Sequence, residues 1–158
     1  MNDEFTVTVT SLGNKVGGIS SDAERKTVFV RGALPGEKVR CRIRKIRKNQ
    51  IEADLVEILE ESPHRTDPFC RYFGECGGCS LQNLDYPQQL FWKRNWIEKA
   101  LSRAGIEFPG GSVKDVIPSP RTCGYRNRVS FDIVSGKPGL HRFRGDTMEV
   151  DGCPLLSP

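Results

Sequence analysis

The chain has 158 residues, enough for one domain or for two small domains with limited cores. It carries 24 Lys and Arg against 20 Asp and Glu, a mild net charge of +4, so an acidic partner has to be argued from where the cations cluster. No apolar run is long enough to span a bilayer, and the N-terminus does not resemble a signal peptide, so no membrane partner is expected. The six cysteines are therefore expected in a reducing, cytoplasmic compartment, where structural disulfides are rare.

Residues 3–61 are predicted to be all β. Phe5, Val7 and Val9 alternate with threonines, the period-two pattern of a half-buried strand. Four further strands are expected, at residues 16–19, 27–30, 38–48 and 51–55. Five short strands in this span favour a small closed barrel of the OB kind.

The predicted strand from Lys38 to Lys48 carries seven cations and no acidic residue. Its apolar parity slips at Ile46, which predicts a β-bulge near Arg44-Lys45. Small OB-type barrels use basic grooves to follow a nucleic-acid backbone, so this face is expected to bind phosphate. The alternative is a solvated strand face that protects an edge, although one or two charges would do that. The residues expected to contact nucleic-acid phosphate here are Arg40, Arg42, Arg44, Lys45, Arg47 and Lys48.

Three cysteines stand within ten residues, Cys70, Cys76 and Cys79, and a fourth, Cys153, lies far downstream. Four thiolates suit a tetrahedral zinc or an iron–sulfur cluster, because both are soft-ligand sites. The C-x5-C gap is unusual for zinc ribbons, and a proline follows Cys153 as it follows the last cysteine of the bacterial ferredoxin run. The spacing therefore favours a cluster, with zinc and disulfides as the alternatives.

A helix is expected after the cysteines, with Asp85 as its N-cap, Pro87 in its first turn and Gly105 at its end. Its apolar face is predicted to consist of Leu90, Ile97, Leu101 and Ala104. Trp92 and Trp96 share a stripe, and packing is favoured over base stacking for them. A β-hairpin is predicted around the Gly-Lys-Pro-Gly turn at residues 136–139.

Several segments together resemble one family. "FVRGALPGEKV" is similar to the TRAM domain, an RNA-binding OB-like module. "RTDPFCRYFGECGGCSLQNLDYPQQLFWK" is similar to the cluster-binding segment of the RNA (uracil-5-)-methyltransferases, especially those that act on 23S ribosomal RNA, and "YRNRVSFDI" and "DGCPLL" match the same family. The resemblance implies that a [4Fe–4S] cluster is held by Cys70, Cys76, Cys79 and Cys153, with Cys41 and Cys123 outside the ligand set. It also implies that Arg126 and Arg128 approach RNA phosphate, with surface solvation as the alternative.

The resemblance does not extend to the catalytic part of the family. Its members continue into a Rossmann-like domain that binds S-adenosylmethionine and carries the cysteine nucleophile, whereas these residues contain no glycine-rich strand–turn–helix fingerprint. S-adenosylmethionine is therefore expected only in a catalytic methyltransferase domain that this chain lacks. The chain would be a truncated form or one part of a split enzyme, and no catalytic residue is assigned in it.

The sequence thus predicts a mainly β, α+β fold. A five-stranded OB-like TRAM barrel is expected in residues 1–62, followed by a small, incomplete iron–sulfur-binding α+β domain in residues 63–158. The predicted function is to hold structured RNA, ribosomal RNA by the resemblance, for the missing catalytic domain. The alternative is a stand-alone RNA-binding TRAM protein with a zinc or redox iron–sulfur site.

Overall fold

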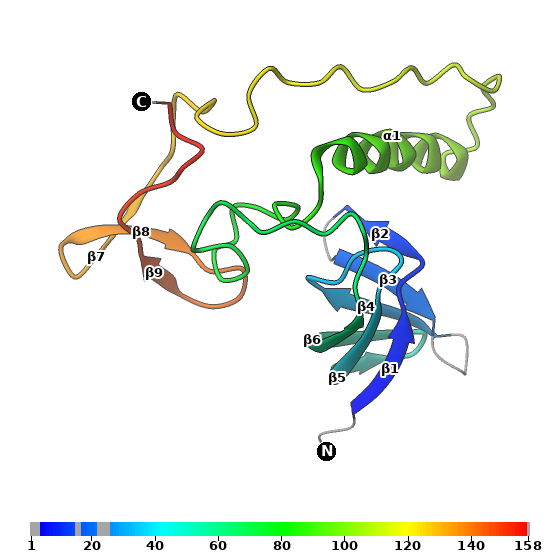
Figure 1. Ribbon diagram of the computed structural model, residues 1–158, viewed down its shortest axis with the longest axis horizontal. Helices are drawn as coiled ribbons and strands as arrows, with labels where there is room; N and C mark the ends of the chain where they lie inside the picture. The colour runs from blue at the N-terminus through cyan, green and yellow to red at the C-terminus, as the bar shows by residue number, and fades with distance from the viewer. Residues whose placement is uncertain (1–3, 15–16, 22–25, 158) are drawn as a thin grey trace. The chain divides into compact units, whose positions relative to one another are not determined.

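The N-terminal strands form one mixed sheet. The structure is a computed structural model that describes residues 4–14, 17–21 and 26–157. The strand order is β1-β5-β6-β4-β3-β2, and only the β4–β6 pairing is parallel among the described strands (Figure 1). The bounds are β1 Glu4–Thr8, β2 Ser11–Gly13, β3 Gly17–Ser21, β4 Thr27–Arg31, β5 Lys38–Arg47 and β6 Gln50–Glu60.

The two ends of this sheet meet. β1 and β2 are consecutive in the chain but lie at opposite ends of the strand order, so the residues between them join both edges. The Thr10 amide donates to the Ile19 carbonyl at 2.9 Å, and the Ser20 hydroxyl donates to the Thr8 carbonyl at 2.6 Å. These bonds satisfy edge groups that an open sheet would expose, which is how small barrels avoid free edges.

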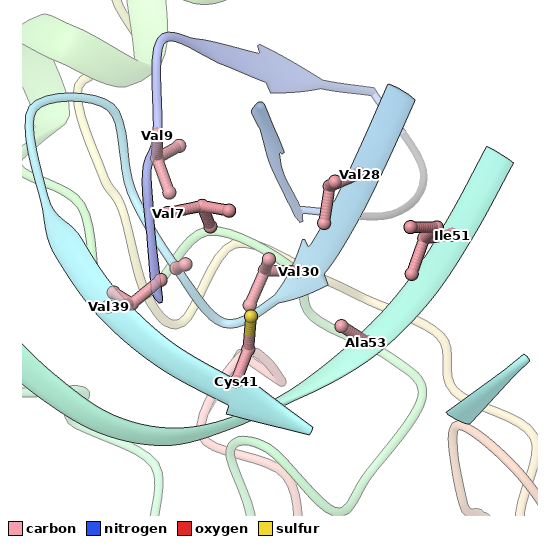
Figure 2. Packing of buried hydrophobic residues seen from close by; sticks show 9 residues of the cluster. Val7, Val9, Val28, Val30, Val39, Cys41, Ile51 and Ala53 are labelled. Carbon is pink, nitrogen blue, oxygen red and sulfur yellow. The ribbon is translucent and has the colours of Figure 1, made fainter. Parts of the chain in front are cut away.

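The core of the barrel consists of inward-facing residues of the four strands β1, β4, β5 and β6 and of the connections that follow β1 and β4 (Figure 2). Its labelled members, each at most 7% exposed, are Val7, Val9, Val28, Val30, Val39, Cys41, Ile51 and Ala53. The predicted barrel is confirmed, with the short β2 as a sixth strand among the described residues. The predicted strand at 16–19 corresponds to β3, although Val16 lies outside the described residues.

Helix α1, Tyr86–Arg103, begins and ends as predicted. The Asp85 carboxylate accepts a hydrogen bond from the Gln88 amide at 2.8 Å, a standard N-cap contact. The predicted apolar face is only partly right: Leu90 and Leu101 are half-buried, but Ile97 is 50% exposed and Ala104 is exposed. The buried residue of the helix is Trp92. The Trp96 indole donates to the Leu12 carbonyl of β2 at 2.7 Å, so the tryptophan stripe packs on the barrel.

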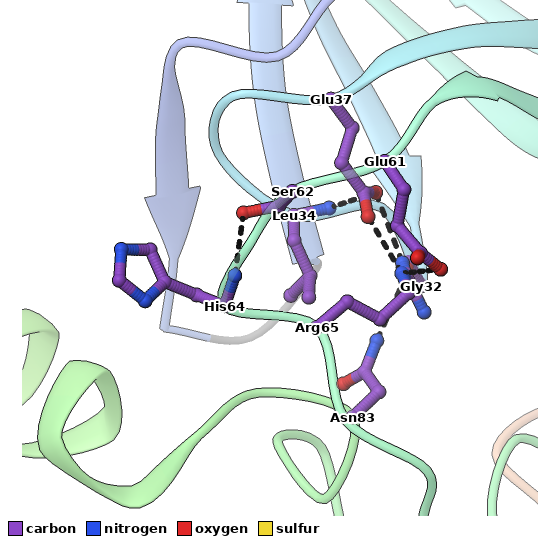
Figure 3. Close-up of polar contacts among 8 residues, drawn as sticks. All are labelled: Gly32, Leu34, Glu37, Glu61, Ser62, His64, Arg65 and Asn83. Atoms are coloured by element: carbon purple, nitrogen blue, oxygen red, sulfur yellow. Dashed lines mark hydrogen bonds and ion pairs between the residues drawn. The ribbon is translucent and has the colours of Figure 1, made fainter.

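A buried ion pair fixes the chain that leaves the barrel (Figure 3). The Glu37 carboxylate is fully buried, accepts from the Leu34 amide at 2.8 Å and pairs with Arg65, whose Nε and Nη2 lie 2.6 and 2.9 Å from its oxygens. Arg65 and Asn83 both donate to the Gly32 carbonyl, at 2.8 and 3.0 Å. Residues 65 and 83 are therefore held against the turn between β4 and β5.

The chain forms two interleaved units, Met1–Thr66 with Asn83–Asp115, and Asp67–Gln82 with Val116–Pro158. The first contains the barrel and α1. The second contains an antiparallel sheet in the order β7-β8-β9, with β7 at Asp132–Val134, β8 at Lys137–His141 and β9 at Thr147–Glu149. β7 and β8 form the predicted hairpin. Separate domains at 1–62 and 63–158 stay a prediction. No helix in the described part of the chain is long and apolar enough to cross a membrane.

Candidate functional site

The cysteine-rich segment of the second unit is a series of tight turns. The Phe73 amide donates to the Cys70 carbonyl at 3.0 Å, and the Cys76 amide donates to the Tyr72 carbonyl at 2.9 Å. Gly74 adopts a φ of +93°, a conformation that favours glycine. These turns bring Cys70 and Cys76 back toward each other within seven residues.

The second half of the segment lies against the end of β8. The Gly77 amide donates to the His141 carbonyl at 3.0 Å, and the Phe143 amide donates to the Glu75 carbonyl at 2.9 Å. A Cβ added at Gly77 would meet the backbone of Arg142 and Phe143 at 3.3 Å, closer than most such contacts. Glycine at position 77 therefore permits the close approach that places this turn on β8.

Cys153 is brought to the same place by contacts of its neighbours. The hydroxyl of Tyr72 accepts from the Asp151 amide at 2.9 Å, and Arg71 forms an ion pair with the Asp151 carboxylate. On the other side of Cys153, the Gly124 amide donates to the Pro154 carbonyl at 3.0 Å. Cys153 thus follows a residue that is anchored to the cysteine-rich turns themselves.

The four cysteines with the predicted spacing line one cavity of about 370 Å³, a size that accommodates a small ligand. Its apolar walls come from Phe73, Val129, Leu140, Phe143 and Leu155. Among the described residues, no three Cys, His, Asp or Glu side chains form a group that could hold a metal ion. The structure therefore brings the predicted ligands to one cavity, and the cluster itself stays a prediction.

The electrostatics of the cavity centre on Cys79. Burial raises the pKa of its thiol above the ordinary value, and nearby Cys153 and Cys70 raise it further. A side-chain hydrogen bond from Gln82 and the charge of Arg126 act in the opposite direction. The Gln82 side-chain oxygen also accepts from the Cys70 amide at 3.2 Å. Crowded thiols of this kind lose their protons readily only when a cation or a metal compensates the charge.

The other two cysteines do not contribute to the wall of this cavity. Cys41 is fully buried in the barrel, where its Sγ contacts the Phe5 carbonyl at 3.5 Å and burial raises its pKa to about 11. Cys41 therefore acts as a small apolar residue of the barrel core. Cys123 is exposed and is absent from the cavity wall.

The basic strand β5 faces a row of carboxylates. Its pairing with β6 contains the predicted bulge, a register shift between Ile43 and Lys45. The ion pairs of its outward face are Lys38–Glu60 at 3.1 Å, Arg42–Glu4 at 2.7 Å, Arg47–Glu52 at 3.5 Å, Arg40–Glu57 and Arg44–Glu52. Lys45 and Lys48 have no carboxylate within 4 Å among the described residues.

These pairs lower the positive potential that the sequence alone suggested, because β6 supplies acids that sit beside β5 only once the strands pair. Most of the pairing side chains are a third exposed or more, and exposed pairs of this kind contribute at most about 1 kcal/mol. An RNA phosphate can therefore replace a carboxylate at small cost. Contact of these residues with RNA stays a prediction.

The two arginines predicted to approach RNA differ in their surroundings. Arg126 is half-buried and lines the cysteine cavity, whereas Arg128 is exposed and does not. Sequence reasoning missed the cavity-facing positions of Gln82, Arg126 and Arg142. Gln82 lies 3 residues after Cys79, whereas Arg126 and Arg142 lie 27 and 11 residues before Cys153, and no local pattern marks any of the three.

The sequence of this chain is similar to those of known RNA methyltransferases. Residues 2–56 match the TRAM domain family. The chain is 36% identical over 156 residues to the 23S rRNA (uracil(1939)-C(5))-methyltransferase of Halomonas elongata, a match covering 95% of this chain and 32% of that protein. It is 37% identical over 139 residues to an uncharacterized RNA methyltransferase of Nitratidesulfovibrio vulgaris, covering 84% of this chain and 29% of that protein. The resemblance to RNA uracil-C5-methyltransferases is confirmed.

A solved structure is similar as well. The tRNA (uracil-54, C5)-methyltransferase of Pyrococcus abyssi, crystallised in complex with S-adenosyl-L-homocysteine, matches with a TM-score of 0.63 and 26% identity. The match covers 97% of this chain and 33% of that one. This chain thus spans about a third of the length of the RNA methyltransferases that it matches. Its TRAM domain contains the whole of the basic strand β5.

Proposed function

We propose that this chain is the RNA-binding, [4Fe–4S]-bearing N-terminal part of an S-adenosylmethionine-dependent RNA uracil-C5-methyltransferase that acts on ribosomal RNA. The observation that carries the proposal is the convergence of Cys70, Cys76, Cys79 and Cys153 on one cavity in a chain with a TRAM domain. The relatives support the reaction class by their names, and one of them acts on 23S rRNA.

The donor set fits an iron–sulfur cluster better than a single zinc ion. Zinc–thiolate bonds of about 2.3 Å would draw four sulfurs to within about 4 Å of one another. A cluster separates its thiolates, because iron and sulfide atoms lie between them. A cavity of about 370 Å³ with all four cysteines on its wall leaves room for such iron and sulfide atoms. The Gly78 amide, 3.4 Å from the Cys76 sulfur, supplies the kind of N–H···S contact that stabilises a ligating thiolate.

Cys70, Cys76, Cys79 and Cys153 would hold the cluster, which when bound supplies a cross-link between residues more than 70 positions apart. The apolar walls of the cavity limit the access of water to the ligating sulfurs. We place S-adenosylmethionine binding and methyl transfer in a separate catalytic domain, for which this chain holds the RNA.

The RNA-binding part of the proposal predicts the effect of replacing Arg42, Arg44 and Arg47 by glutamine. RNA affinity should fall to a similar extent for structured RNAs of different sequence, because phosphate contacts do not read bases. The slope of log affinity against log salt should decrease by up to about three units, since each lost contact leaves its counterions on the RNA. Filter binding of ribosomal RNA fragments at several salt concentrations measures both quantities.

The matched control replaces three exposed cations away from β5, namely Lys93, Arg103 and Lys114, by glutamine, which changes the net charge by the same amount. The control should keep most of the affinity and the slope. Equal losses in both variants would show a general charge effect. Unchanged binding in the β5 variant would show that the basic strand is only a solvated face.

A further inference from the structure

Among the residues that the structure describes, one cation on the wall of the cysteine cavity has no acidic partner. Arg142 lines the cavity but pairs with Glu75, and its Nε lies 3.6 Å from Asp146. His141 also lines it, 3.1 Å from the Asp132 carboxylate. Within the described residues, Arg126 has no carboxylate within 4 Å. Its charge is therefore not neutralised by the part of the chain that the structure describes.

The backbone of Arg126 is fixed close to Cys153. Its amide donates to the Leu155 carbonyl at 2.7 Å, and its carbonyl accepts from the Ser157 amide at 2.7 Å. Arg126 therefore belongs to the same hydrogen-bonded segment as Cys153. Its guanidinium lies 6.0 Å from the centre of the Tyr125 ring, at the outer limit of a cation–π contact, so that ring holds it weakly.

The charge of Arg126 acts on the cysteines from this position. Arg126 lines the same apolar-walled cavity as Cys70, Cys76, Cys79 and Cys153. Four thiolates in an apolar cavity carry a large negative charge, and a nearby cation offsets part of the cost of burying it. A paired arginine such as Arg142 contributes less, because its carboxylate partners cancel its field.

We propose that Arg126 is a positioning residue for the cysteine site, whose uncompensated charge stabilises the anionic thiolates and the cluster that they hold. The inference rests on the proposed function, because it requires a cluster at these cysteines. It assigns Arg126 to the cluster and leaves Arg128 as the arginine of this segment that is free to meet RNA.

The test compares Arg126→Gln and Arg126→Lys with Arg128→Gln, a matched control of equal charge change on an exposed residue. Each full chain is purified without oxygen and reduced by dithionite, and two quantities are measured. They are the rate of iron release to a chelator and the midpoint potential by EPR-monitored titration. Removing a cation disfavours the more negative, reduced cluster, so Arg126→Gln should lower the potential.

We expect Arg126→Gln to release iron about tenfold faster. Its ratio of reduced to oxidised cluster at a fixed potential should fall by up to about tenfold, which corresponds to 59 mV for one electron. Arg126→Lys should restore most of both values, and Arg128→Gln should match the wild type. If Arg126→Gln loses its iron during purification, retention by Arg126→Lys supports the role of charge, and loss by both variants overturns it.

The outcomes separate the inference from the proposed function. A wild type that holds its cluster, with unchanged potential and iron release in Arg126→Gln, would overturn the inference alone. A loss of RNA affinity in Arg126→Gln with an unaltered cluster would also overturn it, and would assign Arg126 to phosphate binding. A wild type without iron would overturn both.

Discussion

Replacing Cys153 by serine is expected to abolish retention of the [4Fe–4S] cluster, whereas replacing Cys123 by serine should leave it unchanged. Cys153 lines the cavity with the other three proposed ligands, and Cys123 is exposed and is not on the cavity wall. Serine offers a hard oxygen in place of a soft thiolate, so a ligand is removed with little change in volume. Iron and acid-labile sulfide per chain, after anaerobic purification, measure the effect.

The proposed cluster would also contribute to stability, because it would join the cysteine-rich turns to a residue more than 70 positions away. A covalent cross-link over a loop of that length contributes about 4 kcal/mol in the chain-entropy model. Proteolysis of the second unit should therefore be faster in Cys153→Ser than in Cys123→Ser. Iron loss in Cys123→Ser and retention in Cys153→Ser would mean that the fourth ligand has been assigned wrongly.

Replacing Glu37 by glutamine is expected to destabilise the barrel by about 3 kcal/mol, the cost of leaving one member of a buried ion pair without its partner. The substitution keeps the shape of the side chain, but it removes the charge that faces Arg65 and turns an acceptor into a donor beside Arg65 or the Leu34 amide. Urea unfolding followed by tryptophan emission suits this test, since Trp92 and Trp96 both lie in the first unit.

Glu61 provides the matched control for this substitution. It lies 4.0 Å from the same Arg65 nitrogen, but its side chain is 68% exposed. Glu61→Gln should therefore change the free energy of unfolding by less than about 0.5 kcal/mol. Equal effects of the two substitutions would contradict a structural role for the buried pair.

Local signals in the sequence were sufficient where the structure depends on neighbouring residues. The Asp85 cap, the proline in the first turn of α1 and the bulge beside Lys45 all follow from short patterns, and all are confirmed. The spacing of Cys70, Cys76 and Cys79 likewise indicated that these three thiols would lie together, and the family resemblance added Cys153 to them. The cap, the proline, the bulge and the cysteine run each depend on residues that are close together in the sequence.

Features that depend on distant residues could not be predicted. Glu37 appeared as part of a turn, and its burial depends on Arg65, which is 28 positions away. The carboxylates that pair with β5 come mainly from β6, so their effect appears only when the register is known. The buried face of α1 is set by its contact with β2, where Trp96 finds the Leu12 carbonyl. In each case a long-range polar contact decides the outcome.

The iron and sulfide content of the wild-type chain, purified without oxygen, tests the central claim most directly. That claim is that Cys70, Cys76, Cys79 and Cys153 hold a [4Fe–4S] cluster in an RNA-binding chain. It predicts a brown protein with about four irons and about four acid-labile sulfides per chain, as expected for a cubane with four cysteine ligands. A colourless protein with about one zinc per chain and no sulfide would contradict it.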